Sequence, residues 1–465
     1  MSVTAATAGA VTARRRFGHP AALAVLAGTE SWVSFSYYGM QSLLVLYMTH
    51  QLLLPGHLGR VWGIEPFRHV LALFYGAVSG QPLAAAVMGI YTALYFATPI
   101  LGGLVADRLL GRTRTIVLGC VLMTLGHCLM TFEPSFLLAL LCLVCGSGCA
   151  GNLKTQVGDL YRRDDPHRAE AFQLFVLVVQ VAVIVAPLVC GALGEGYRWS
   201  LGFAAAGVGM LAGLVVYVAG IRLLPREPRL AERLGVMPEP AMTREEWGRV
   251  GLLLLLLPVL AIVAVGNMEI FNGYIVWGER FYSLRLWGHH LPVSWLLSLD
   301  GLIGTVTLGG SVLFWRWWAR RRQEPDEIGK IVAASVLLAL APLVLALASM
   351  VATRRGGTVG LGWGVVFHLV NDVGFSNFYG IGIALFSRTA PRRLAGTMVN
   401  AFSLHLVMAN LLVGWLAGLL ATMPASRFWI LHSLLIAVGT LLLAAARRPV
   451  RRRLGGETAL VETKA

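Results

Sequence analysis

Five acidic or basic side chains other than histidine lie away from the ends of stretches of the sequence that are otherwise apolar enough to cross a membrane. They are Glu30, Lys154, Glu269, Asp300 and Asp372. An ionisable group at bilayer depth costs about 2.5 kcal/mol or more on insertion scales, so it is expected to face a partner or an aqueous pathway. We therefore interpret these residues as candidates for proton transfer or for binding a charged substrate.

A histidine and three cysteines also have side chains that could do chemistry. His405 can titrate near neutral pH, which suits a proton relay; the alternative is a hydrogen-bonded packing residue. Cys142, Cys145 and Cys149 share one face of an expected helix at spacings of three and four. Buried cysteine commonly behaves as a small apolar residue and no matching ligand cluster accompanies these three, so we expect no metal site.

The composition shows what surrounds these residues. Of the 465 residues, 57% are hydrophobic and 13% charged, and the mean hydropathy is +0.71, which is far too apolar for a soluble protein of this length. The net charge of +15 comes from basic residues crowded between apolar stretches, which indicates membrane topology rather than nucleic-acid binding. The sequence has no P-loop, nucleophile elbow or zinc-binding helix motif, so we expect neither an enzyme nor a cofactor.

Twelve stretches have the length of about 20 apolar residues that a membrane-spanning helix needs, which predicts an all-α membrane protein. They lie at roughly 20–51, 82–106, 115–132, 135–160, 169–193, 200–224, 249–280, 291–318, 330–352, 359–387, 397–421 and 426–446. A further segment at 56–80 carries Arg60 and Arg68 among apolar residues. We interpret it as an interfacial helix or a lid.

The basic residues predict the orientation and the domain organisation. Most arginines of the short loops lie on one side if the N-terminus is cytoplasmic, so both termini are expected in the cytoplasm. The charged, proline-containing segment 225–248 separates residues 1–224 from residues 249–446, and a basic tail follows at 447–465. Two bundles of six helices are the arrangement of transporters whose substrate site lies near the midplane between the halves.

The segment "GGLVADRLLGRTRTI" resembles the signature loop between the second and third helices of the major facilitator superfamily. Paired glycines allow helices to approach closely, and an aspartate with arginines can form a charge lock that differs between transport states. The expected gating residues are Gly102, Gly103, Asp107, Arg108 and Arg112. The alternative is an ordinary basic loop.

Nearly the whole chain resembles the proton-dependent oligopeptide transporter family, as a divergent member. The resemblance rests on "FSYYGMQSLLVLYM", "GIYTALYFATPILGG", "TQVGDLY", "APLVCGALGE", "SWLLSL" and "APRRLAGTM", which occur in the family's order. It implies the major facilitator fold, with twelve transmembrane helices in two six-helix bundles, and proton symport of small peptides.

On the first and fourth helices the resemblance implies a proton-coupling site. The family's charged trio is reduced to Glu30, because Val33 and Ser34 occupy its other two places. Asn152 matches a family position, and Lys154 lies about one helical turn from the place of the family lysine. We expect Glu30 and Lys154 to pair until a proton or a substrate arrives. The alternative for Glu30 is a structural hydrogen-bonding role.

In the second half the resemblance implies recognition of a positively charged group. Asp300 takes the place of a family asparagine, and Asp372 lies one turn before the place of the glutamate that resembles the anchor for a peptide's amino end. Two carboxylates facing a cavity favour a cation; the alternative for Asp372 is a hydrated, idle position. Glu269 aligns with an acidic family residue, for which gating and hydrogen bonding are both open. Phe402 stands where the family has a tryptophan.

The other expected substrate-binding residues are aromatic or amide side chains. Tyr37, Tyr38, Tyr91 and Tyr95 lie at or near pocket aromatics of the family. Tyrosine presents a ring and a hydroxyl, which suits varied peptide side chains. Gln180 takes the place of a family asparagine on the fifth helix.

These observations predict a secondary transporter of peptides or peptide-like amine-bearing compounds that works by alternating access and is coupled to protons. Two alternatives stay open: a proton-independent facilitator or exporter of a peptide-derived metabolite, and a non-transporting transceptor or assembly partner. The expected partners are a small peptide-like substrate, protons and membrane lipids. We expect a monomer in the bacterial inner membrane.

Overall fold

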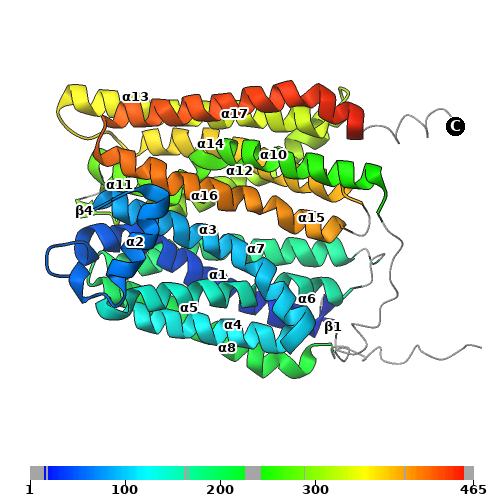
Figure 1. Ribbon diagram of the computed structural model, residues 1–465, viewed down its shortest axis with the longest axis horizontal. Coiled ribbons are helices and arrows are strands. Elements are labelled where there is room, and N and C mark those ends of the chain that lie inside the picture. Colours follow the sequence, from blue (N-terminus) through cyan, green and yellow to red (C-terminus); the bar gives the residue numbers. More distant parts are fainter. Residues whose placement is uncertain are drawn as a thin grey trace, which may run out of the picture.

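The chain folds into long helices that lie roughly side by side (Figure 1). The computed structural model describes residues 15–16, 19–161, 165, 167–225, 242–286, 288–391 and 394–454. Residues 226–241 of the predicted linker and 455–465 of the predicted tail lie outside the described residues. The strands of the described part form two short antiparallel hairpins, β1 (Arg15–Arg16) with β2 (His19–Pro20) and β3 (Arg285–Leu286) with β4 (His289–His290).

The helices of the first half begin after β2 and end before the linker. They are α1 (Ala21–Tyr47) with a π-helical end at Met48–Leu52, a 3-10 turn at Leu58–Arg60, α2 (Ile64–Tyr75), α3 (Gln81–Val105) with a π-helical end at Ala106–Leu110, α4 (Arg112–Met130), a 3-10 turn at Glu133–Ser135, α5 (Phe136–Ala150), α6 (Leu153–Asp159), α7 (His167–Gly194), and α8 (Trp199–Gly220) with a 3-10 end at Ile221–Leu223.

The helices of the second half follow the linker. They are α10 (Arg244–Met268) with a 3-10 turn at Glu269–Phe271, α11 (Gly273–Phe281), α12 (Trp295–Ala319), α13 (Glu327–Arg355), α14 (Gly362–Thr389), α15 (Ala395–Phe402), α16 (Leu404–Leu416) with a 3-10 end at Ala417–Ala421, and α17 (Ala425–Leu454).

The start of α10 follows from local sequence chemistry. The Thr243 hydroxyl accepts the backbone N–H of Glu246 at 3.2 Å, and the Glu246 carboxylate accepts the backbone N–H of Thr243 at 2.8 Å. This capping box satisfies two of the amide groups that an isolated helix end leaves unpaired. The helix therefore begins at Arg244, five residues before the span that hydropathy predicts.

Ten helical segments of the described residues are long and apolar enough to cross a membrane. The two long helices that fall outside this set are α1 and α14. These carry Glu30 on α1 and His368, Asn371 and Asp372 on α14, all of them buried. With these two, the twelve helices expected from the sequence are present, and the prediction of an all-α membrane protein is confirmed. The polar character of α1 and α14 indicates that they face the interior of the bundle rather than lipid.

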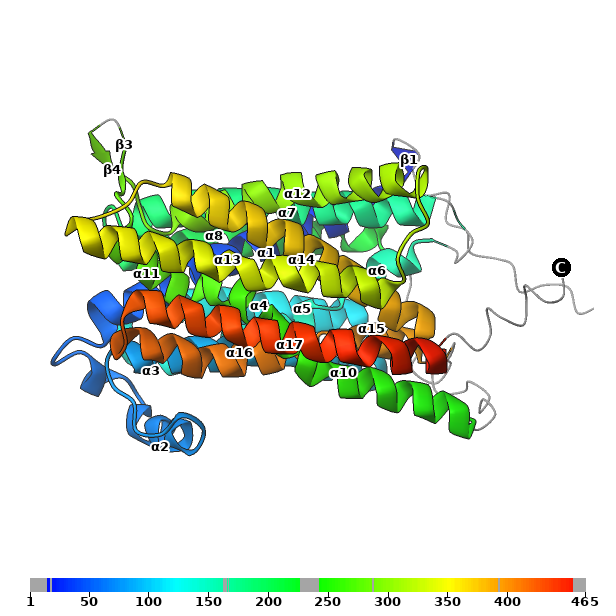
Figure 2. The same cartoon turned by 90° about the horizontal axis from the view of Figure 1, so that it is seen from above.

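Helices from the two parts of the chain pack mainly with their own part. α1 packs on α7 and α8, and α4 on α5, whereas α13 packs on α14 and α17, and α10 on α16 and α17. The two halves meet along α3 with α16 and along α7 with α12 (Figure 2). At the first of these contacts Gly89 and Gly414 lie so close that a Cβ on Gly89 would be 2.5 Å from the Gly414 Cα.

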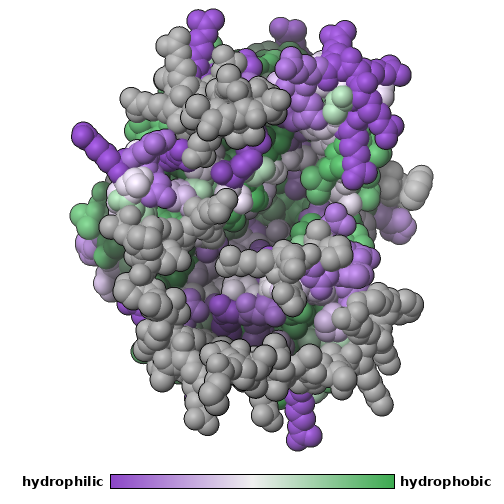
Figure 3. All heavy atoms as spheres, turned by 90° about the vertical axis from the view of Figure 1, so that its right-hand side faces the viewer, coloured by the Kyte–Doolittle hydropathy of each residue, from purple (hydrophilic) through white to green (hydrophobic). Residues whose placement is uncertain are grey.

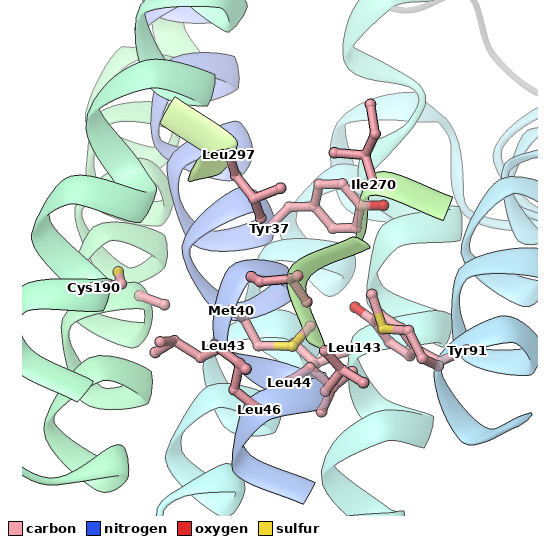
Figure 4. Packing of buried hydrophobic residues seen from close by; sticks show 14 of the residues in the cluster. Tyr37, Met40, Leu43, Leu44, Leu46, Tyr91, Leu143, Cys190, Ile270 and Leu297 are labelled. Carbon is pink, nitrogen blue, oxygen red and sulfur yellow. The ribbon is translucent and has the colours of Figure 1, made fainter. Parts of the chain in front are cut away.

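Buried residues of both halves share one hydrophobic cluster near one end of the bundle. We call the end where α1 begins and α17 ends the terminal face, and the other end the opposite face. Near the opposite face Ile270 and Leu297 of the second half belong to the same buried cluster as Met40 of α1 (Figure 4). The second half has a further cluster whose buried members all come from residues 250–450, and Phe96 of α3 packs against it. Apolar contact thus seals the opposite face.

Several polar contacts between described residues of the two halves also lie near the opposite face. At the opposite face His50 Nε2 lies 2.9 Å from Glu279 Oε2, and the Asn272 amide donates to the Ala85 carbonyl at 3.0 Å. The Tyr75 hydroxyl, at the end of α2, donates to the Leu411 carbonyl of α16 at 3.0 Å. The placement of 56–80 at a membrane interface stays a prediction.

Figure 3 looks onto the terminal face, where the described surface is recessed between hydrophilic side chains.

Candidate functional site

Four tyrosines of α1 and α3 form one aromatic group near Glu30. The rings of Tyr37 and Tyr95 stack with centroids 3.9 Å apart, Tyr38 meets Tyr37 edge-on at 4.9 Å, and Tyr91 lies 6.3 Å from Tyr95. Glu30 precedes Tyr37 by seven residues, which is about two helical turns and returns to the same face of α1. The structure thus gathers the four tyrosines that the sequence singled out, and their role in substrate binding stays a prediction.

Glu30 and Lys154 do not form the expected ion pair. No hydrogen bond or ion pair with a described residue involves either side chain, although the Lys154 ammonium is near enough to act electrostatically on Glu30. Lys154 is exposed, whereas Glu30 is 9% exposed. Lys154 is displaced from the expected position because the helix is interrupted before it: α5 ends at Ala150 and α6 starts at Leu153.

The break between α5 and α6 is held by Asn152. Its side-chain amide donates to the Gly102 carbonyl at 3.2 Å and to the Cys149 carbonyl at 3.0 Å. Gly102 must be glycine there, since a Cβ would lie 1.9 Å from the Gly148 carbonyl oxygen. In this conformation the buried Asn152 therefore joins two helices, and its amide is not directed to a ligand.

Tyr38 of α1 lies beside the second half, where its ring centroid is 6.4 Å from that of Phe271. It is partly exposed, and it lies near enough to Glu30, Asp300 and Tyr379 to interact electrostatically with all three. A second link runs from α7 to α12, where the Gln180 amide donates to the Thr305 hydroxyl at 3.0 Å. Acidic and hydroxyl-bearing side chains of both halves thus approach one another where α1, α7, α12 and α14 come together.

The second half contributes a hydrogen-bonded network around Asp300. His368 Nδ1 lies 2.9 Å from Asp300 Oδ1, and His368 Nε2 lies 2.9 Å from the Tyr274 hydroxyl. One oxygen of Asp300, one of Asp372 and a ring nitrogen of His368 lie within 4.8 Å of one another. His368 is fully buried and Asp372 is 5% exposed, whereas Asp300 is partly exposed. The arrangement can bind a cation or a proton.

The structure does not bring Glu269, Phe402 and His405 into this group by any contact. Glu269 is fully buried with Oε2 3.8 Å from His432 Nε2. His405 Nδ1 bonds the Phe402 carbonyl, and the His405 ring packs on Phe402 and Tyr379 with centroids 4.3 Å and 6.2 Å apart. These contacts are those of packing residues, and no described carboxylate pairs with His405 for the expected relay.

The signature loop forms a charge cluster at the terminal face. Arg112 contacts Asp107 at 3.8 Å and also forms an ion pair with Asp159 at the end of α6. Gly103, unlike its neighbour Gly102, has no atom within 4 Å of the place of its Cβ. Arg108 is exposed. The paired glycines therefore differ: only the first permits close helix approach.

Two carboxylates that sequence reasoning did not select, Asp159 and Glu195, join segments that are distant in the sequence. Asp159 lies in the quoted segment "TQVGDLY", but its pairing with Arg112 joins residues 47 positions apart. Glu195, just after α7, accepts the backbone N–H groups of Val293 and Ser294 at 2.7 Å and 2.9 Å, at the start of α12 in the other half. Its position at the end of "APLVCGALGE" was the available signal.

Sequence reasoning did not assign His368 or Tyr274 to the site. His368 and Asp372 are four residues apart on α14 and so share a helix face, which was a usable signal. Tyr274 is 94 residues from His368, and nothing in its local sequence indicates the contact.

Known proteins resemble this chain in sequence. The family model of the Major Facilitator Superfamily matches residues 31–405. An uncharacterized transporter of Bacillus subtilis (strain 168), YclF, is 25% identical over 474 residues, which cover 89% of this chain and 90% of that protein. A di-/tripeptide transporter of Lactococcus lactis subsp. lactis (strain IL1403) is 37% identical over 227 residues, covering 47% of this chain and 42% of the relative.

Solved structures share the fold over nearly the whole chain. A peptide transporter POT crystallised with sulfate superposes with a TM-score of 0.79 at 23% identity, covering 95% of this chain and 97% of that one. A POT family transporter in complex with 5-aminolevulinic acid gives 0.78 at 19% identity, covering 94% and 98%. At these identities the likeness establishes the fold.

Proposed function

The chain belongs to the major facilitator superfamily, and on that premise we propose that it is a secondary active transporter of peptides or peptide-like amine-bearing compounds, coupled to protons. The observation that carries this proposal is that Tyr38 of the first half lies within electrostatic range both of Glu30 in its own half and of Asp300 in the second half. An acid inside a membrane is costly unless it has a partner or faces an aqueous pathway, and each half places one near the same tyrosine. The name of the Lactococcus relative supports the substrate class.

We propose that Asp300 and Asp372 receive the positively charged end of the substrate. Neither carboxylate has a lysine or arginine partner among the described residues. The four tyrosines Tyr37, Tyr38, Tyr91 and Tyr95, with Gln180, then line the remainder of the passage. An aromatic wall accommodates varied side chains, while the acids supply charge selection.

Proton coupling in the first half is assigned to Glu30, with Lys154 as its partner in another state of the cycle. Their electrostatic interaction without an ion pair fits a pair that separates in the conformation described here. His405 stays a prediction as a relay, because its contacts are those of a packing residue.

Alternating access follows from the uneven contacts between the halves. The opposite face is sealed by shared core and polar contacts, so the described conformation opens to the terminal face. With both termini in the cytoplasm of a bacterium, as the positive-inside rule favours, this is an inward-facing state in the inner membrane. The cluster of Arg112 with Asp107 and Asp159 lies where a cytoplasmic gate must rearrange.

Uptake by purified protein in liposomes tests the proposal. L-alanyl-L-alanine is expected to enter faster when a pH gradient is imposed, and Glu30→Gln is expected to remove that stimulation. Entry that no gradient changes would identify a facilitator instead. No entry of any di- or tripeptide, together with no ligand-induced thermal stabilisation, would rule out a peptide transporter and leave the exporter of a peptide-derived metabolite and the non-transporting role.

A proton-independent facilitator is the second candidate, and a specific observation favours it. Val33 and Ser34 replace the family's Glu-Arg pair, and Glu30 has no ion pair in the described structure. The liposome measurement with and without a gradient separates this candidate from the first.

A further inference from the structure

The end of α12 at the terminal face carries a dense group of aromatic and basic side chains. Residues 314–322 read "FWRWWARRR" and contain Trp315, Arg316, Trp317, Trp318, Arg320, Arg321 and Arg322. We propose that this segment, which we call the α12 end site, binds an anionic phospholipid. The lipid phosphate meets the arginines, and its acyl chains lie along the exposed face of α12. The inference does not depend on what the protein transports.

The four arginines have no counter-charge in the described part of the chain. All four are exposed, and none forms an ion pair with a described carboxylate. The next three carboxylates in the sequence are each paired with another cation: Glu324 with Lys330, Asp326 with Arg447 and Glu327 with Arg388. A helix C-terminus offers only about half an elementary negative charge, which is too little to balance four guanidinium groups. An anion from outside the chain is therefore expected here.

Tryptophan rings orient two of the guanidinium groups. The guanidinium carbon of Arg321 lies 4.9 Å from the ring centroid of Trp317, and that of Arg322 lies 5.5 Å from the ring centroid of Trp318. Such a contact does not use the N–H donors, so the planar fork that matches a phosphate bidentately stays available. Tryptophan is also enriched at the level of lipid headgroups in membrane proteins. Both properties match a phosphate that is part of a lipid.

The remaining tryptophan fixes the segment to the bundle. Trp315 Nε1 donates to the side-chain oxygen of Asn377 on α14 at 2.6 Å, and the Lys330 ammonium of α13 lies 4.3 Å from the Trp315 ring centroid. The Asn377 amide donates to the hydroxyl of Ser311 on α12 at 2.9 Å. Contacts with α13 and α14 thus hold the α12 end site in place, and a preorganised site loses less entropy when it binds a ligand.

An exposed apolar face of α12 leads to the arginines. Leu302, Val306 and Leu313 are 52%, 67% and 66% exposed. Among the ten described segments that could cross a membrane α12 is the least buried, and it lies along an edge of the bundle (Figure 2). Residues 18 apart in a helix complete about five turns, so Arg320 lies on the same face as Leu302, about 27 Å further along. On this face Gly309 has no atom within 4 Å of the place of its Cβ, which leaves a gap for an acyl chain.

A second copy of the chain is the other occupant that an exposed apolar face with a glycine could accept. Two parallel copies that met through this face would bring their arginine groups together, and like charges at an interface oppose association. A lipid phosphate neutralises the arginines instead. The charge of the α12 end site therefore favours the lipid over the second copy.

Native mass spectrometry of the purified full chain tests the site, with 1,2-dioleoyl-phosphatidylglycerol or 1,2-dioleoyl-phosphatidylcholine added to the detergent solution. Wild type is expected to bind the anionic lipid more tightly. Arg316→Gln/Arg320→Gln should weaken that binding by roughly 25-fold, since each basic side chain near anionic lipid contributes a factor of about five. The control Arg354→Gln/Arg355→Gln, which removes two exposed arginines at the end of α13 on the opposite face, should leave it unchanged. Equal binding of the two lipids by wild type, or an equal loss in both double variants, would overturn the proposal.

A conservative variant separates lost binding from lost folding. Arg316→Lys/Arg320→Lys keeps both charges and should retain most of the affinity for phosphatidylglycerol. Both double variants at these positions should unfold at the wild-type temperature in lipid-free detergent, because the two side chains are exposed. A lysine variant that is folded and has lost as much affinity as the glutamine variant would contradict an electrostatic site.

Two further measurements distinguish the lipid from other occupants. Gly309→Leu fills the gap and should weaken phosphatidylglycerol binding, whereas Gly251→Leu, at an equally open position of α10, should not. sn-Glycerol 3-phosphate, which has the phosphate without acyl chains, should not displace the lipid at equal concentration; displacement would identify a site for free phosphate esters and overturn the lipid site. A wild-type dimer that carries no phosphatidylglycerol and that Gly309→Leu dissociates would identify a second copy as the occupant instead.

Discussion

At the residue scale, the two halves hold their acids in different ways. A hydrogen bond with His368 holds the Asp300 carboxylate in one position, and the other ring nitrogen of His368 is hydrogen-bonded to the Tyr274 hydroxyl. Glu30 forms no hydrogen bond or ion pair with any described residue, although it is 9% exposed. A buried acid without a partner is costly unless it is protonated or its surroundings change. Glu30 is therefore the acid expected to change its state during a transport cycle.

A double-mutant cycle checks that Glu30 and Lys154 form no ion pair in the described conformation. Without an ion pair, the effects of Glu30→Gln and Lys154→Ala on thermal stability should add to within about 0.5 kcal/mol. Lys154→Ala alone should change little, because the side chain is exposed. A coupling energy above about 1 kcal/mol would mean that the pair forms in the resting protein.

At the element scale, the approach of α3 to α5 depends on one glycine of an adjacent pair. Gly102→Ala places a Cβ 1.9 Å from the Gly148 carbonyl oxygen, whereas Gly103→Ala meets no atom within 4 Å. We expect Gly102→Ala to lower the unfolding temperature by an amount equivalent to about 1–3 kcal/mol or more, as overpacking does. The matched Gly103→Ala should be neutral or slightly stabilising. Equal effects of the two substitutions would contradict the close contact.

A second element-scale contact joins the end of α7 to the start of α12. We call Glu195 with the backbone N–H groups of Val293 and Ser294 the latch. Burial raises the pKa of the Glu195 carboxyl, the hydrogen bonds from Ser294 and Val293 oppose that rise, and Glu279 adds to it. When the opposite face opens, Glu195 meets water and its pKa returns toward the ordinary value. The closed state therefore binds the proton more tightly than the open state.

The sign of the pH dependence follows from that difference. Lowering the pH toward the ordinary range of a carboxyl group favours the state with the higher pKa, which is the closed opposite face. Spin labels at Tyr197 and His289, both exposed, should report a growing short-distance population as the pH falls. Glu195→Gln, which resembles the protonated form, should flatten this dependence. A short-distance population that shrinks at low pH would contradict the latch.

At the scale of the whole molecule, hydropathy predicts the helices but not their contacts. Twelve apolar stretches indicate twelve helices because length and composition decide whether a segment can span a bilayer. Contacts across the bundle depend on how each helix is rotated and where it breaks. The break before α6 displaces Lys154, and the contact of His368 with Asp300 joins residues 68 positions apart. Neither can be read from local periodicity.

In the proposed transport cycle, polar groups of both halves face a single water-filled passage that opens to the terminal face. Labelling of cysteines on α12 tests it directly, in a chain whose six native cysteines are replaced. Gly304 faces Asp372, whereas Leu302 is 52% exposed on the outside and lies about 200° around the helix from it.

We predict that Gly304→Cys reacts rapidly with a membrane-impermeant maleimide applied to the terminal face and slowly when the reagent is applied to the opposite face. The control Leu302→Cys should react only with a lipid-soluble reagent. Gly304→Cys that is unreactive from the terminal face, or that behaves like Leu302→Cys, would contradict a shared aqueous passage.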